Sequence, residues 1–349
     1  MGEIDWDLLS SYAGLITLAG VSVFVGAFGS LPSPKDSNGV SVYGDDEENM
    51  DRVSSSDAWL FPLFGSAALL GLYTIVKVFG TDWINWFLGW YFSVAGIGSV
   101  WKSSIFLARY ILGPRRWTQF SKSNISIRYN YKTVFFLSWR TPSLFLLPIA
   151  AIPSALYSFS SFNRKSVLLT DILALSFTHN ALSVLKIDSF QTGSILLSGL
   201  FFYDIWWVFG TEVMVKVATN LDVPIKLLWP KSVAFASNQG FTMLGLGDVV
   251  IPGTFVALAL RYDYSRSLRT GSFRKPYFHA SLGAYVLGLI AAFSAMYMFE
   301  AAQPALLYLS PACILSLFAT AVLRKELDTV WSWSDDPTQI STIAINKEK

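Results

Sequence analysis

The chain has 349 residues, of which 53% are hydrophobic and only 14% are charged, and its mean hydropathy is +0.45. A soluble domain carries about a quarter of its residues as Asp, Glu, Lys and Arg, so this composition excludes an ordinary soluble protein and indicates a membrane protein. The single cysteine, Cys313, excludes an internal disulfide and a metal site built from cysteines.

Apolar runs of a length that can cross a bilayer recur along the whole chain. A membrane-spanning helix needs about 20 residues, and nine runs meet or approach that length. The N-terminal 7 residues hold Asp and Glu but no Lys or Arg, which favours a retained first span over a cleaved signal peptide. The last two runs are nearly continuous, so the count could be eight. The fold class is therefore all-α and polytopic, with about nine transmembrane helices at residues 8–29, 58–79, 83–105, 144–162, 167–187, 192–217, 240–260, 277–299 and 304–322.

The distribution of Lys and Arg between the connecting segments predicts the orientation. If the N-terminus is luminal, the cytosolic segments hold eighteen Lys and Arg and the luminal segments hold four. Cytosolic loops are enriched in these residues, so we expect a luminal N-terminus and a cytosolic C-terminus. Residues 1–323 are read as a single membrane-embedded domain, with an acidic loop at 30–57 and a basic cytosolic loop at 112–143, and residues 324–349 as a cytosolic tail.

The basic loop has an ordinary explanation. It obeys the orientation rule, and its positive charge suits anionic lipid headgroups, so nucleic-acid binding is not expected. The glycosylation sequon that begins at Asn124 lies in this loop and is therefore predicted to stay unmodified.

Two aspartates stand out among the ionisable residues of the spans. Such a residue costs several kcal/mol inside a membrane and indicates function by default. Asp204 lies at the centre of the predicted span 192–217, and Asp248 lies near the centre of 240–260. These spans are consecutive and antiparallel, so equal register places the two carboxylates at a similar depth.

The other polar residues in the spans have simpler explanations. Lys77 lies close enough to a span end for its ammonium group to reach the membrane surface. His179 and Asn180 are expected to form hydrogen bonds across a helix interface. Asp171, one turn inside its span, is expected to face a luminal vestibule.

A facing pair of carboxylates suits peptide hydrolysis. Like charges at such short range cannot both ionise, so the pair shares one proton. The ionised member can take a proton from the water that attacks a peptide carbonyl, while the protonated member polarises that carbonyl and later protonates the leaving amine. The sequence leaves open which aspartate takes which role.

Two short motifs adjoin this chemistry. In Gly245-Leu246-Gly247-Asp248, the glycines lack a Cβ and leave room for an extended substrate strand, although glycines in membrane helices often serve packing alone. Gln303-Pro304-Ala305-Leu306 opens the last span, where Pro304 is typical either of an ordinary helix start or of an irregular segment that lines a cavity.

Together these motifs resemble the signal peptide peptidase family, the presenilin-like intramembrane aspartyl proteases with a Gly-x-Gly-Asp active site. Tyr203-Asp204, the Gly-x-Gly-Asp run and the Gln-Pro-Ala-Leu run occur in the family's order, and the likeness is dense over residues 190–306, the predicted catalytic region. The resemblance implies that Asp204 and Asp248 are catalytic. It further implies a substrate-binding set of Tyr203, Gly245, Leu246, Gly247, Gln303, Pro304, Ala305 and Leu306.

The resemblance also implies a setting for the protein. Its substrates would be the transmembrane helices of signal peptides and of type II membrane proteins, met within the lipid bilayer of the endoplasmic reticulum. No cofactor and no metal is expected. Quality-control or degradation factors of the endoplasmic reticulum and further copies of the chain are implied as partners. The tail has Lys347 without a second lysine at Asn346, so it lacks a full dilysine retrieval signal.

Other functions were weighed on the residues. The chain has no His-Glu-x-x-His for zinc and no Gly-x-Ser-x-Gly for a serine nucleophile. A proton-coupled transporter also keeps acids near the bilayer midplane, but it commonly repeats its broken helices in two halves, and the first half of this chain has no such counterpart. A membrane-protein chaperone that binds without cleaving is the third alternative.

Overall fold

The computed structural model describes residues 6–32, 52–129, 132–159, 166–214, 217, 223–231 and 240–335; most of the predicted acidic loop and of the tail lies outside them. The strands are β1 (Lys122–Tyr129), β2 (Lys132–Arg140), β3 (Lys226–Pro230) and β4 (Phe241–Gly245). The helices are α1 (Trp6–Gly29), α2 (Ser55–Phe79), α3 (Thr81–Gln119), α4 (Thr141–Phe159), α5 (Val167–Val184), α6 (Phe190–Phe209), α8 (Leu246–Thr270), α9 (Pro276–Phe299), α10 (Leu306–Leu323) and α11 (Leu327–Trp331).

The helices confirm a polytopic, mainly helical membrane protein. Within the described residues, seven are long and apolar enough to cross a membrane, namely α1, α2, α4, α5, α6, α9 and α10. The predicted spans 83–105 and 240–260 coincide with α3 and α8, which are not among those seven. Helix α3 is 39 residues long and kinks at Gly113, where φ is 73°, and the second half of α8 is rich in charged residues.

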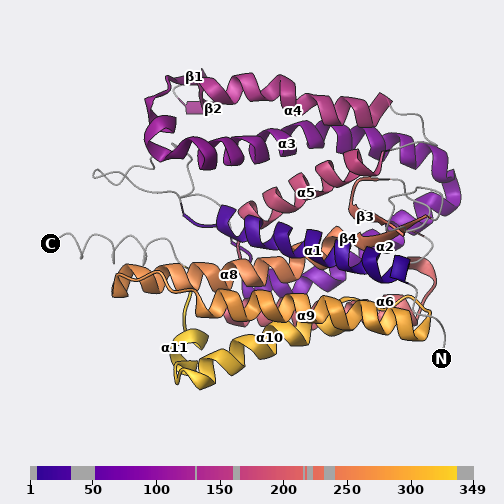
Figure 1. The fold of residues 1–349 in the computed structure, drawn as a ribbon. Coiled ribbons are helices and arrows are strands. Elements are labelled where there is room, and N and C mark those ends of the chain that lie inside the picture. The colour runs from indigo at the N-terminus through magenta and orange to yellow at the C-terminus, as the bar shows by residue number, and fades with distance from the viewer. Residues whose placement is uncertain are drawn as a thin grey trace.

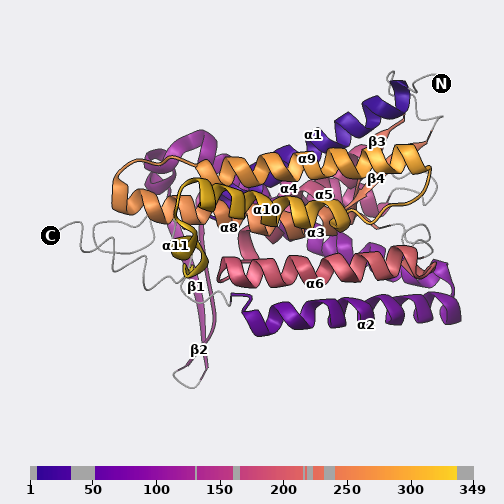
Figure 2. The same cartoon turned by 90° about the horizontal axis from the view of Figure 1, so that it is seen from below.

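The helices pack in layers. Figure 1 shows α3 and α4 as a pair at one edge, α5 and α1 in the middle, and α8, α9 and α10 along the other edge. In the perpendicular view, α2 and α6 form a separate layer on one side of the molecule (Figure 2). Helix α6 contacts α2 on one side and α8 and α10 on the other. Helix α6, which carries Asp204, therefore lies between α2 on the outside and α8 and α10, which carry Asp248 and Leu306.

The predicted basic loop 112–143 contains regular secondary structure in its described residues. It contains the end of α3 and the antiparallel hairpin β1–β2, in which Ile125 is paired with Leu137. Figure 2 shows this hairpin projecting from the helices. Segment 132–140 is rich in β-branched and aromatic residues, which favour strands. The prediction of a loop rested on the number of Lys and Arg residues and did not use this strand signal.

Cross-helix hydrogen bonding by Asn180 is confirmed. Its Nδ2 donates to the carbonyl and hydroxyl oxygens of Ser99 on α3, at 2.8 and 2.7 Å. His179, the neighbouring residue, packs its ring on Phe106, with the ring centroids 4.5 Å apart. These contacts tie α5 to α3.

A buried ion network closes the end of the molecule near α11. The Nε atom of Arg261 on α8 lies 2.9 Å from Oδ2 of Asp335, and both side chains are at most 3% exposed. Arg52 lies 3.4 Å from the same oxygen, and the amide of Asp335 donates to the carbonyl of Asp188 at 2.7 Å. Asp335, which follows α11, is thus held against α8, the segment before α2 and the link between α5 and α6.

Candidate active site

Asp248 lies in the first turn of α8, so the prediction that residues 240–260 form one continuous helix with Asp248 near its centre was wrong. Residues 241–245 form β4, and the helix begins at Leu246. The amide of Leu246 donates to the carbonyl of Ile225 at 3.0 Å, which extends the β3–β4 pairing up to the start of the helix. This pairing converts the first part of the predicted helix into a strand. Asp248 is therefore placed where helix amides favour a negative charge.

Asp204 lies near the carboxyl end of α6 and not at the centre of a helix that runs from 192 to 217. The helix ends at Phe209 with Gly210 as its C-cap. The Asp204 side chain is buried, with 3% of its surface exposed. Its Oδ2 accepts a hydrogen bond from the amide of Leu306 at 2.9 Å.

The Gln-Pro-Ala-Leu motif forms the entry to α10. Residues 302–304 are irregular, Pro304 and Leu306 are buried, and Leu306 is the first residue of the helix. Gln303 accepts a weak hydrogen bond from the Tyr308 hydroxyl at 3.4 Å. The first amide of the helix points at Asp204, so the irregular segment ends directly on a candidate catalytic residue.

The two acids lie on helices that contact each other, Asp204 near the end of α6 and Asp248 near the start of α8. The charge of Asp204 reaches Asp248, which is only partly exposed. A Cβ built on Gly245 would lie 3.4 Å from Oδ2 of Asp248, while one built on Gly247 would meet no atom within 4 Å. Open space therefore adjoins the backbone next to Asp248. No group of three or more His, Cys, Asp or Glu with metal-binding geometry occurs in the described part of the chain.

Four of the predicted substrate-binding residues have packing contacts with the hydrophobic core, namely Tyr203, Leu246, Ala305 and Leu306. A Cβ built on Gly65 of α2 would lie 3.3 Å from the Tyr203 ring, which also contacts the Trp207 ring at 6.3 Å between centroids. Tyr203 therefore belongs to the side of α6 that faces α2.

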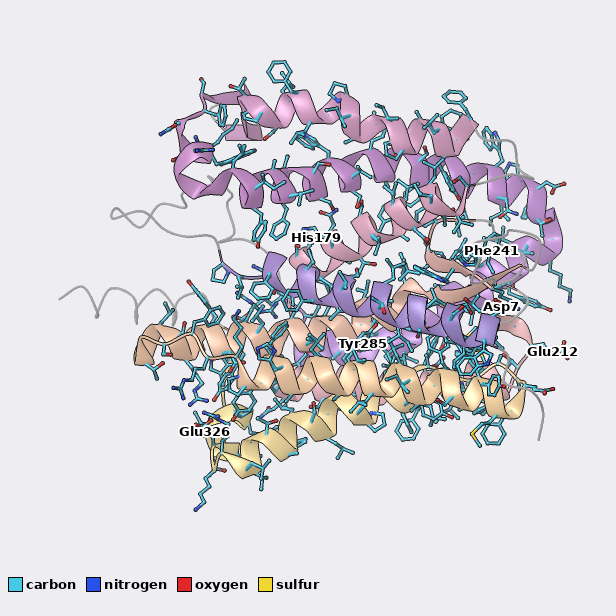
Figure 3. All side chains as sticks on the ribbon, in the orientation of Figure 1. Asp7, His179, Glu212, Phe241, Tyr285 and Glu326 are labelled. Carbon is cyan, nitrogen blue, oxygen red and sulfur yellow. The ribbon has the colours of Figure 1, made fainter. Side chains whose placement is uncertain are left out.

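Tyr285 is a candidate that the sequence reading missed. It lies midway along α9 (Figure 3), its side chain is completely buried, and it interacts electrostatically with Asp248. Its hydroxyl has no hydrogen-bond partner among the described residues. A buried phenol usually finds such a partner. A single tyrosine in an apolar helix carries no local signal that separates it from ordinary packing.

Comparisons with known proteins agree on one family. The family model described as signal peptide peptidase matches residues 45–337, which include both aspartates and the Gln-Pro-Ala-Leu motif. The signal peptide peptidase of Homo sapiens is 35% identical over 97% of this chain and 87% of that protein. That of Mus musculus is 36% identical over 93% of this chain and 83% of that protein. A probable intramembrane protease of Schizosaccharomyces pombe is 36% identical over 85% of this chain and 88% of that protein. The chain belongs to the signal peptide peptidase family of intramembrane aspartyl proteases.

Proposed function

We propose that this protein cleaves the transmembrane segments of signal peptides and type II membrane proteins, with Asp204 and Asp248 as its catalytic dyad. The observation that carries the proposal is the meeting of these two carboxylates, from α6 and α8, inside a polytopic helical body. Membership of a protease family favours this function over a transporter and over a chaperone that does not cleave.

The dyad works by moving protons around one water molecule. With one proton shared between the acids, the ionised carboxylate takes a proton from water as its oxygen attacks the substrate carbonyl. The protonated acid hydrogen-bonds the carbonyl oxygen and then passes its proton to the amine as the C–N bond breaks. The amide of Leu306 holds Oδ2 of Asp204, which orients that carboxylate toward the reacting atoms.

The β3–β4 hairpin offers a place for an unwound substrate. A helical peptide bond is protected by its own hydrogen bonds, so the segment to be cut must first become extended. Facing residues of an antiparallel pair of strands alternate: one pair exchanges backbone hydrogen bonds, and the backbone groups of the next pair point away from the partner strand. The amide of Leu228 in β3 donates to Asp171 and therefore points away from β4. Met243 in β4 is the register partner of Leu228, so its backbone amide and carbonyl point away from β3. Met243 is 46% exposed, and we infer that an extended substrate pairs with the edge of β4 that faces away from β3 and leads to Asp248.

The remaining expectations belong to the same proposal. The protein would act in the endoplasmic reticulum membrane with its N-terminus luminal, without a cofactor. Its partners would be substrate helices, quality-control or degradation factors and further copies of the chain. A luminal origin of substrates is compatible with the position of β3–β4 at the end of the molecule where α1 begins (Figure 1).

The test is cleavage of a signal-peptide-like transmembrane substrate by the purified protein in liposomes. Asp204→Asn and Asp248→Asn should each reduce the cleavage rate by at least about 10³-fold, because removing one member of a catalytic unit disables the whole unit. A transition-state mimic of aspartyl proteases should block the wild-type protein.

Asp82→Asn is the matched control, because Asp82 is exposed in the first turn of α3. It should cleave like the wild type. Wild-type turnover by either dyad variant, with its fold intact, would disprove the assignment of the dyad.

A further inference from the structure

Asp171 on α5 binds the hairpin that leads to Asp248. Its Oδ1 accepts a hydrogen bond from the amide of Leu228 in β3 at 2.8 Å. Asp171 is partly buried within a predicted span. An ionisable side chain there costs free energy, so its presence indicates a functional role. The dyad chemistry does not require this carboxylate.

The bond closes one of the two edges of the hairpin. Because the Leu228 amide points away from β4, it belongs to the outer edge of β3. An unpaired outer edge is a template for pairing with another strand. With Asp171 on this edge, an extended substrate is directed to the edge of β4, which continues into Gly245 and Asp248.

The neighbouring residue of β3 is held from a second side. A Cβ built on Gly14 of α1 would overlap the indole of Trp229, so the ring lies directly on the backbone of α1. Leu227, on the other side of Leu228, is completely buried in the core. Strand β3 is thus packed by apolar contacts, while Asp171 provides the polar contact that sets its position along α5.

We propose that Asp171 is a positioning residue that acts as a hydrogen-bond acceptor, not as a charge. It fixes β3, and through the β3–β4 register it fixes the strand edge that presents substrate to Asp248. This inference rests on the proposed function and adds to it a residue outside the dyad. Loss of the acceptor should let the hairpin shift, which lowers the cleavage rate and broadens the set of bonds that are cut.

Substitutions at Asp171 separate the acceptor from the charge. Asp171→Asn keeps a carbonyl oxygen at the same place and should retain a cleavage rate within about threefold of the wild type. Asp171→Leu has a similar shape but no acceptor, and its kcat should fall about 10- to 100-fold, as expected when a partly buried amide is left without its acceptor. KM should change much less, since the substrate still enters the same membrane site.

Hydrogen exchange gives a readout that does not depend on activity. In Asp171→Leu, the amides of segment 226–229 should exchange faster than in the wild type, while those of α10 keep their protection. Asp171→Asn should restore the protection of β3. The matched control is Asp82→Leu, the same change at an exposed residue of α3, which should alter neither exchange nor cleavage.

Each outcome decides the proposal. Wild-type cleavage and wild-type exchange in Asp171→Leu would overturn it, and so would an Asp171→Asn variant as slow as Asp171→Leu, since that would require the charge. If Asp171→Leu does not accumulate, Asp171→Glu replaces it. That variant keeps the charge but moves the acceptor by one methylene, and slow, scattered cleavage would support the proposal while wild-type cleavage would overturn it. Asp248→Asn in the same assay must be inactive; if it is active, the proposed function itself has failed.

Discussion

Asp204 and Asp248 each face the amino end of a helix, although the two helices are different. Asp248 lies in the first turn of α8, and Asp204 accepts the first amide of α10. Helix amino ends carry about half of a positive charge and stabilise a nearby anion. One negative charge can therefore be held on the pair in a surrounding that is otherwise apolar.

The hydroxyl of Tyr285 is expected to take part in this arrangement. It is buried beside Asp248 with no partner among the described residues, so it is available to a carboxylate, a water or a substrate oxygen. Tyr285→Phe should lower kcat by about 10- to 100-fold, the effect expected for one hydrogen bond to a charged group. Because no hydrogen bond of the described fold is lost, the thermal midpoint should stay unchanged.

Tyr297→Phe makes the same change further along α9, at a side chain that is 39% exposed, and serves as the control. Equal rates for Tyr285→Phe and wild type would show that the phenol has a packing role only. A lower thermal midpoint for Tyr285→Phe would point to a hydrogen bond in the resting protein.

At the scale of elements, the predicted span 240–260 consists of strand β4 followed by the first part of helix α8. The five residues of β4 rise about 3.3 Å each and the roughly 15 residues of α8 before Arg261 rise about 1.5 Å each, so together they cover up to about 39 Å. A hydrocarbon core is about 30 Å thick. The apolar part of α8 can therefore be too short to cross the membrane alone and still lie in the membrane-crossing part of the chain.

Helices α8 and α9 both contact Glu326, which lies just after α10. Its carboxylate is held by both terminal nitrogens of Arg266 on α8 at 2.7 Å and by the Tyr277 hydroxyl of α9 at 2.9 Å. Burial raises the pKa of Glu326, but the hydrogen bond from Tyr277 and the charges of Arg266 and Arg324 outweigh it, so the pKa lies below its usual value of 4.5. The ionised form thus stabilises the fold above pH 4.5, and this stabilisation is lost as the pH falls through the lower pKa of the folded state.

Glu326→Gln should accordingly destabilise the protein at pH 7 by on the order of 1 kcal/mol, the size of a partly exposed ion-pair contact. The difference in thermal midpoint between the variant and wild type should shrink when both are measured below pH 4.5. Glu300→Gln, the same change at an exposed residue, should produce no such difference at either pH. A difference that grows toward acid pH would contradict the role given to Glu326.

At the scale of the whole molecule, different elements lie at the two ends of the helices. One end carries the start of α1 and the β3–β4 hairpin, and the other carries α11 and the base of β1–β2 (Figure 1). The excess of Lys and Arg predicts that the β1–β2 end is cytosolic.

Glycosylation in microsomes tests this orientation. The sequon at Asn124 in β1 should stay unmodified, because a cytosolic asparagine never meets the luminal transferase. An N-terminal extension that carries Asn-x-Thr should be modified. A glycan on Asn124, or an unmodified extension, would reverse the predicted orientation.

The sequence by itself determined the class of the molecule, the approximate ends of most helices, both acids and the motifs that belong to one family. These properties are local: apolar length, caps and short runs of residues are readable without knowledge of what lies beside them. The first span, for example, was predicted at 8–29 and is α1, Trp6–Gly29.

Only the tertiary structure decided how the site is assembled. The partner of Asp204 is 102 residues away in the chain and the partner of Asp171 is 57 residues away. Periodicity within a helix carries no information about such partners. The hairpin that moves Asp248 to a helix start forms because β4 finds β3, and the buried pair of Arg261 and Asp335 joins α8 to the segment after α11. A hydrogen bond or ion pair in an apolar interior depends on distance in space, and folding sets that distance.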